Sequence, residues 1–173
     1  GEVPQPEGIG LGEPYMVEAR SGKLIGLFRY GTSKLAEKFM FQAESCDGGR
    51  TWTEPVKTAI LGYPAHMIRL PDDRILLVYG VRVPPFGERA RVSVDEGQTW
   101  SGPHLVTSDP RGGVMDRGVH ALPDGSLFLH ASFNELVPAE DTAHGNRWIS
   151  RPGKPFWVRS TDEGHTLSLI HIS

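Results

Sequence analysis

The sequence has one cysteine, no long apolar run and no cluster of basic residues, and each scarcity excludes a class of protein. Cys46 alone cannot form an intramolecular disulfide bond, so a disulfide-stapled scaffold is excluded. No stretch approaches the ~20 apolar residues that span a bilayer. The net charge of −3, without a basic run, argues against nucleic acid as a partner.

Motifs for metal, phosphate and serine-nucleophile chemistry are also lacking. The histidines at 66, 120 and 130 do not have the spacing of a metal-ligand set. Neither a glycine-rich phosphate loop nor a G-x-S-x-G elbow occurs. We therefore expect no metal and no cofactor.

What the sequence has in abundance is turns. Its 21 glycines and 14 prolines indicate many turns between short strands, which is typical of an all-β protein. One turn motif, S-x-D-x-G-x-T-W, occurs twice in full and once with Leu167 in place of the final Trp. The motif positions are Ser45, Asp47, Gly49 and Trp52, then Ser93, Asp95, Gly97 and Trp100, then Ser160, Asp162 and Gly164. Asp and Gly favour a tight turn, and the Trp is a large apolar anchor that pins it to a neighbouring sheet.

A hairpin pattern precedes each copy of the motif. Apolar alternation leads to a turn at Gly22, Asp73 or Gly125, and an apolar run follows. The period of about 50 residues favours four-stranded propeller blades. Ile75–Tyr79 fits an inner strand that neighbouring blades cover on both faces, and Val56–Leu61 and His104–Thr107 fit outer strands. The third repeat is longer, and we expect a surface loop within Asn134–Pro155.

The sequence thus predicts part of a propeller over residues 1–166, with blades at about 10–61, 62–108 and 114–166. The last seven residues, Leu167–Ser173, interrupt the third motif and resemble the translation of a sequencing-library adapter. We expect this tail to be non-native. Because a closed propeller has about 4 to 8 blades, we expect the three-blade chain alone to be inactive.

The S-x-D-x-G-x-T-W motif is similar to the Asp box, or bacterial neuraminidase repeat, of the sialidase superfamily. The phrase between Gly80 and Arg91 also resembles segments of bacterial sialidase-family proteins. This resemblance implies a six-bladed propeller when intact, in which the Asp boxes are structural. It also implies hydrolysis of a terminal sialic acid, in which three arginines bind the substrate carboxylate and a Glu is base to a nucleophilic Tyr.

Two residues match the layout that the resemblance implies. Glu13 opens one strand and Arg29 ends the next, so a hairpin centred on Gly22 brings them to the same end. We interpret Glu13 as the base partner and Arg29 as a carboxylate ligand; a surface salt bridge is the alternative. Guanidinium groups suit this role because they bind a carboxylate bidentately.

Further site residues are less well defined by the sequence. Arg89 is favoured over Arg82 and Arg91 as another carboxylate ligand. No Tyr stands before the third hairpin, where the resemblance implies the nucleophile. Asp116 is a catalytic candidate there, and Arg117 and His120 could also line a pocket, although an ordinary loop is the better interpretation of all three.

Three functions remain open. The first is a sialidase-like glycoside hydrolase whose partner is a glycan with a terminal acidic sugar. The second is a non-catalytic Asp-box propeller that binds carbohydrate or protein. The third is an enzyme of the same fold with another substrate, in which Asp116 or His120 replaces the Tyr. Since glycan ends are mostly extracytoplasmic, we expect the intact protein to be secreted, periplasmic or on the cell surface.

Overall fold

The computed structural model describes residues 1–32, 34–108, 112–138, 148–162 and 168–170, which form three four-stranded antiparallel sheets. Each sheet uses consecutive strands in sequence order. Blade 1 contains β1 (Leu11–Glu18), β2 (Leu24–Tyr30), β3 (Phe39–Ser45) and β4 (Val56–Leu61), with a 3-10 turn, η1 (Leu35–Glu37), before β3. Blade 2 contains β5 (Ala65–Arg69), β6 (Ile75–Val81), β7 (Gly87–Ser93) and β8 (His104–Thr107). Blade 3 contains β9 (Gly112–Ala121), β10 (Leu127–Pro138), β11 (Trp148–Ser160) and β12 (Ser168–Ile170).

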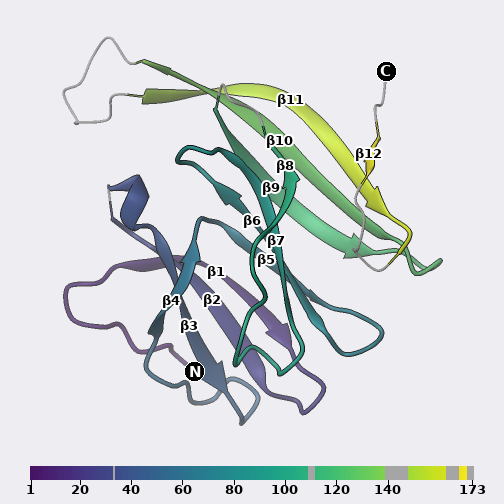
Figure 1. The fold of residues 1–173 in the computed structure, drawn as a ribbon. Helices are drawn as coiled ribbons and strands as arrows, with labels where there is room; N and C mark the ends of the chain where they lie inside the picture. The colour runs from purple at the N-terminus through teal and green to yellow at the C-terminus, as the bar shows by residue number, and fades with distance from the viewer. Residues whose placement is uncertain (33, 109–111, 139–147, 163–167, 171–173) are drawn as a thin grey trace.

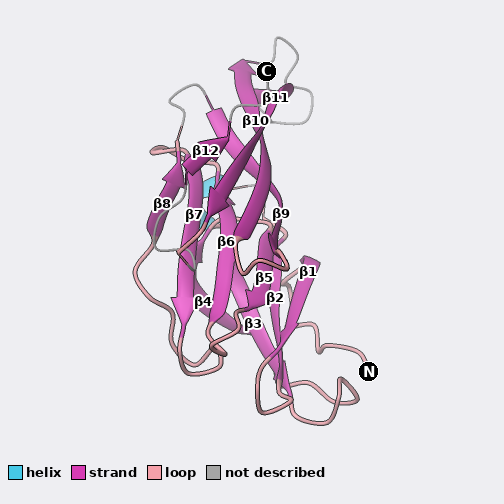
Figure 2. Ribbon diagram, turned by 90° about the vertical axis from the view of Figure 1, so that its right-hand side faces the viewer, coloured by secondary structure: helices cyan, strands magenta, loops and turns pink. Residues whose placement is uncertain are grey.

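The three sheets stand next to one another as propeller blades (Figure 1). Their first strands are neighbours, because β1 contacts β5 and β5 contacts β9. Figure 2 shows these inner strands toward one side of the molecule and the outer strands β4, β8 and β12 toward the other. The predicted all-β architecture of four-stranded blades is confirmed for three blades.

Strand β6 is at the centre of the core. Every residue from Ile75 to Gly80 is buried. Ile75, Leu77 and Tyr79 pack toward blade 1, whereas the residues that alternate with them, Leu76 and Val78, pack toward blade 3. This confirms that neighbouring blades cover both faces of the run. Burial of each large side chain contributes about 1.5–3 kcal/mol, so the central blade joins the other two.

The expected loop within Asn134–Pro155 is wrong for the described part of that stretch. Strands β10 and β11 continue their pairing from Asn134↔Pro152 to Pro138↔Trp148, beyond a register shift after Ser132. A hairpin can lengthen in this way because antiparallel pairing uses backbone groups, and prolines are tolerated beside irregularities. Residues 139–147 lie outside the described residues.

The loop interpretation of Asp116, Arg117 and His120 is also wrong, because all three lie in β9, the first strand of blade 3. Their polar sequence obscured a strand whose backbone pairs with β10, Asp116 opposite Ala131. Among the described residues, no helix is long and apolar enough to cross a membrane.

Candidate functional site

Each blade has two ends that differ in character. In blade 1, Glu18 pairs with Leu24, and Leu24 pairs with Ser45, beside the hairpin turn between β1 and β2. The S-x-D-x-G-x-T-W turn begins at Ser45 and therefore lies at this end of the blade, which we call the turn end. Gly12↔Arg29 pair at the opposite, open end. The candidate site described below lies at the open end, away from the repeated turns.

Glu13 and Arg29 form an ion pair at the open end of blade 1. The pairing of β1 with β2 shifts register between Gly12 and Tyr15, and Glu13 within this irregularity has a φ of 45°. A left-handed backbone is uncommon for a residue with a side chain, and such conformations gather at functional sites. The irregularity brings the Glu13 carboxylate to the Arg29 guanidinium, about half of the carboxylate remaining exposed.

Tyr63 joins the open ends of blades 1 and 2. The centre of its ring lies 4.5 Å from Arg29 Cζ and 4.3 Å from Arg82 Cζ, and Lys38 Nζ lies 4.9 Å away. Tyr63 is only 4% exposed, so its ring is a fixed support for three cations. We call Glu13, Arg29, Lys38, Tyr63 and Arg82 the cation cluster.

The backbone beside Tyr63 explains how the cluster is held. Gly62 N–H donates to the carbonyl of Lys38 at 3.1 Å, and Tyr63 N–H donates to the carbonyl of Gly80 at 2.9 Å. Gly62 has a φ of 142°, and a β-carbon there would lie 2.5 Å from the Gly80 oxygen. Only glycine permits this close approach of the β4–β5 connection to the end of β6.

The cation cluster carries an excess of positive charge. Burial lowers the pKa of Lys38, and the neighbouring charges of Arg29 and Arg82 lower it further, whereas Glu13 opposes the shift. The Nε atoms of Arg29 and Arg82 are buried and have no hydrogen-bond partner within the described structure. Buried donors without partners are costly, so three cations facing one carboxylate favour the arrival of another anion.

Arg89, which the sequence favoured over Arg82, lies elsewhere. Its guanidinium donates to the carbonyls of Pro85 at 3.0 Å and Glu88 at 3.2 Å. Arg91 donates from Nε to the Tyr79 hydroxyl at 2.9 Å. The structure therefore brings Arg82 to Arg29, and these bonds tie Arg89 and Arg91 to blade 2. The side chain of Asp116 lies outside the described residues.

The repeated turns at the other end share one hydrogen-bond pattern. Ser45 Oγ donates to Asp47 Oδ1 at 2.8 Å and accepts from Gly49 N–H at 2.9 Å, and Asp47 accepts from Thr51. The second copy repeats these bonds with Ser93, Asp95, Gly97 and Thr99, and in the third Ser160 donates to Asp162. The hydrogen bonds from Thr51 lower the pKa of Asp47 to about 2. Gly164 lies outside the described residues.

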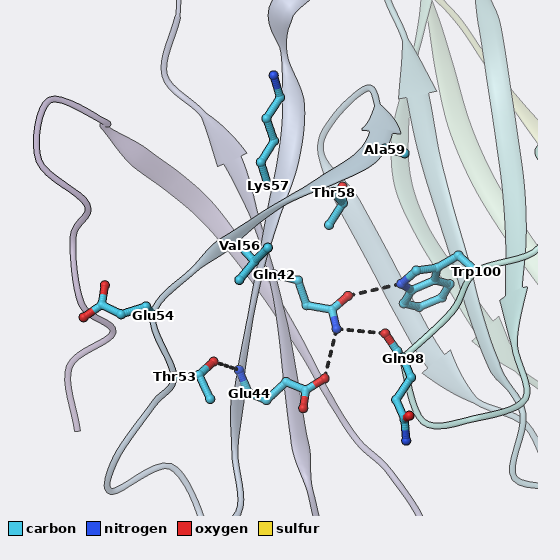
Figure 3. A pocket seen from close by; sticks show the side chains of 11 residues that line it. Gln42, Glu44, Thr53, Glu54, Val56, Lys57, Thr58, Ala59, Gln98 and Trp100 are labelled. Carbon is cyan, nitrogen blue, oxygen red and sulfur yellow. Dashed lines mark hydrogen bonds between the residues drawn. The ribbon is translucent and has the colours of Figure 1, made fainter.

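The second turn also joins blades 1 and 2. Trp100 Nε1 donates to Gln42 Oε1 at 3.1 Å, and Gln42 Nε2 donates to the carbonyl of Gly97 at 2.9 Å (Figure 3). Glu96 accepts two hydrogen bonds from Ser21. A pocket of about 490 Å³ lies beside these bonds, between the outer part of blade 1 and the turn. The pocket does not include a residue of the cation cluster.

Tyr63 and Lys38 were not predicted from the sequence. Tyr63 stands in Gly62-Tyr63-Pro64, directly before the first strand of blade 2, and an aromatic between Gly and Pro at a blade boundary was a usable signal. Lys38 had none, because its position depends on the path between β2 and β3. Among the described residues, no group of three or more His, Cys, Asp or Glu side chains could hold a metal ion.

The family of BNR repeat-like domains matches residues 2–115, more than half of the chain, and the chain belongs to this family. This confirms the resemblance to the sialidase superfamily that the turn motifs indicated. No curated protein matches the chain in sequence.

Solved structures with the same fold share little sequence with the chain. It is similar to a Hadza microbial sialidase (TM-score 0.63, 18% identity), covering 92% of this chain and 37% of that one. It is also similar to an ulvan lyase, a polysaccharide lyase (TM-score 0.69, 14% identity, 91% and 40% covered). A third is an α-L-arabinofuranosidase from Fusarium graminearum (TM-score 0.57, 13% identity, 91% and 49% covered). The chain spans less than half the length of these three structures, and the similarity shows the fold.

Proposed function

We propose that this chain is part of a carbohydrate-active propeller whose cation cluster binds the carboxylate of an acidic sugar. The observation that carries this proposal is the convergence of Arg29, Arg82 and Lys38 around Tyr63, with Glu13 as their anionic partner. Two guanidinium groups and an ammonium can neutralise a carboxylate and supply several charge-assisted hydrogen bonds. The carbohydrate-acting enzymes among the similar folds support the choice of a sugar.

The activity we propose is release of a terminal sialic acid, or a related acidic sugar, by a sialidase-like glycoside hydrolase. The cluster would fix the sugar by its carboxylate and so orient the anomeric carbon. Glu13 would accept the proton of the attacking group, the role that the family resemblance gives to this position. Because glycan ends are mostly extracytoplasmic, this substrate is consistent with export of the intact protein.

Binding of simple sugars to the full chain tests the proposal. N-acetylneuraminic acid and glucuronic acid should bind, and uncharged galactose should not. Arg82→Ala should weaken the binding of both acids by about 10- to 100-fold, the value of one or two hydrogen bonds between charged groups. Arg20→Ala is the matched control, because Arg20 is an exposed arginine whose ion pair with Asp73 lies at the turn end. Equal binding of galactose, or an Arg82→Ala variant that binds as the wild type does, would refute the proposal.

Binding without hydrolysis is the second candidate function. The observation in its favour is that Glu13 is already ion-paired with Arg29, which suits a structural carboxylate as well as a base. Because the three-blade chain alone is expected to be inactive, a fluorogenic sialoside and a fluorogenic glucuronide distinguish the two candidates in the intact protein. Turnover by the intact protein that Glu13→Gln abolishes favours the hydrolase, whereas tight binding of the acids by the intact protein with no turnover favours the binding protein.

A further inference from the structure

A second group of polar side chains lies on the inner strands, next to the cation cluster. The ring centres of Tyr15 on β1 and His66 on β5 are 4.1 Å apart, and those of His66 and His120 on β9 are 5.9 Å apart. Each of the three comes from the first strand of a different blade. His66 is half-buried, whereas His120 is exposed.

One hydrogen bond defines which nitrogen of His66 carries its proton. The backbone N–H of Val119 donates to His66 Nδ1 at 3.1 Å. Because Nδ1 accepts this bond, the neutral imidazole carries its hydrogen on Nε2. Burial lowers the pKa of His66 to about 4, with smaller contributions from His120 and His130 on blade 3. At neutral pH, His66 is therefore an uncharged donor through Nε2.

The Nε2 atoms of His66 and His120 lie near the same point of β9. A β-carbon on Gly118 would lie 3.2 Å from His66 Nε2 and 3.1 Å from His120 Nε2. Gly118 has no side chain, so both rings can approach the strand at this point, where a β-carbon would crowd them. The two nitrogens are thus close enough for one hydroxyl group to bridge them with two hydrogen bonds of about 2.7–3.2 Å.

We propose that His66 and His120 together bind one hydroxyl group of the sugar whose carboxylate occupies the cation cluster. His66 Nε2–H donates to the hydroxyl oxygen, and the hydroxyl donates to His120 Nε2. This pairing recognises a neutral polar group, which the charged cluster does not. It makes the site specific for a hydroxylated acidic sugar over a simple carboxylate.

The chain places the pair within reach of the same ligand. Tyr15 follows Glu13 by two residues on β1, and His66 follows Tyr63 by three residues into β5. Each group therefore has one member on β1 and one at or directly before the start of β5, and Tyr15 lies against His66. The inference rests on the proposed function, since the cation cluster must hold the sugar first.

An NMR titration of the full chain tests the inference. Long-range proton–nitrogen spectra report each imidazole nitrogen, and glucuronic acid, N-acetylneuraminic acid and acetate are the probes. His66→Asn keeps an acceptor for Val119 N–H but has no atom at the Nε2 position, and His120→Ala removes the other nitrogen. We expect both Nε2 signals to move with the two sugars and not with acetate, and each variant to bind the sugars roughly three- to tenfold more weakly. His104→Ala, an exposed histidine on outer strand β8, should bind as the wild type does.

The outcomes separate the inference from the proposed function. If Arg82→Ala weakens sugar binding while neither histidine signal moves and both histidine variants bind normally, the pair has no such role and the cation cluster stands. A proton on Nδ1 of His66 in the unliganded chain also overturns the inference, whatever binds. If neither acid binds the wild-type chain, the proposed function fails and the inference with it.

Discussion

Arg82 of blade 2 and Arg29 of blade 1 lie over the ring of one residue, Tyr63, at 4.3 and 4.5 Å from its centre. Two like charges held this close repel each other, so the arrangement requires a favourable interaction that offsets the repulsion. The electron-rich face of an aromatic ring supplies part of that compensation, about 0.5–2 kcal/mol for each cation. A bound carboxylate would supply the rest.

Replacement of Tyr63 should therefore separate the role of its ring from that of its hydroxyl. Tyr63→Phe keeps the ring and its contacts with the cations. We therefore expect acidic sugars to bind within about twofold of wild type, which corresponds to a change of about 0.4 kcal/mol in binding free energy. Tyr63→Leu removes both ring contacts and should weaken binding by roughly 3- to 30-fold. Calorimetric titration with glucuronic acid measures both, and urea unfolding checks that each variant is folded. If turnover is present and Tyr63→Phe abolishes it, the hydroxyl takes part in the chemistry and the ring is more than a support.

Lys38 should make the affinity for an acidic sugar depend on pH in the alkaline range. Its pKa is lowered by burial and by Arg29 and Arg82, so its proton is lost at a lower pH than an ordinary lysine's 10.5. Loss of the proton removes a cation from the site, and binding should weaken as the pH rises from 7 to 9.5. Dissociation constants of glucuronic acid across that range measure the effect. Lys38→Met should bind about three- to tenfold more weakly at pH 7 with a flatter profile, and Lys38→Arg should bind tightly throughout. The same alkaline weakening in Lys38→Met would exclude Lys38 as its source.

The fold was largely readable from the sequence because its signals are local and repeated. The turn residues fix φ and hydrogen bonding within a few positions, and the run Ile75–Tyr79 could be buried on both faces only between two sheets. The long β10–β11 hairpin was missed for the converse reason. Its pairing depends on backbone groups that lie opposite one another, and a sequence that contains Pro152 and Pro155 does not indicate a strand.

The candidate site was only partly readable. Glu13 and Arg29 could be paired by counting across one hairpin, since both lie in the same blade. Arg82 and Tyr63 meet them through contacts between blades, and no spacing within a single repeat encodes that distance. The hydrogen bonds of Arg89 to the carbonyls of Pro85 and Glu88 could not be predicted for the same reason, since the sequence gives its strand face but not the backbone groups around it.

Loss of a turn aspartate should affect stability and leave sugar binding unchanged. Asp95 accepts hydrogen bonds from Ser93 and Thr99 and so holds the turn from which Trp100 reaches Gln42. Asp95→Ala should lower the melting temperature by about 3–8 °C, the shift expected for roughly 1–2 kcal/mol. Glucuronic acid should still bind the folded variant with wild-type affinity, because the turn lies at the end opposite the cation cluster. Differential scanning calorimetry and titration below the transition measure the two quantities. A stable variant with impaired binding would contradict the separation of the two ends.

His66 should make folding less stable in mild acid. Its pKa is about 4 in the folded chain, below the ordinary value of 6.5, so the unfolded chain takes up a proton more readily. The contribution of neutral His66 is thus fully present above pH 6.5 and is lost as the pH falls from there to about 4. Because the ring is only half-buried, we expect a loss of about 1–2 kcal/mol.

His66→Asn retains an acceptor for Val119 N–H but does not titrate. We measure the unfolding free energy of both chains in urea at pH 7 and pH 4.5. The wild type should lose more unfolding free energy than His66→Asn between pH 7 and pH 4.5. Comparison of the two chains cancels the titration of the carboxylates that they share, and His104→Asn should follow the wild type. An equal difference at both pH values would mean that His66 is solvated enough to titrate normally.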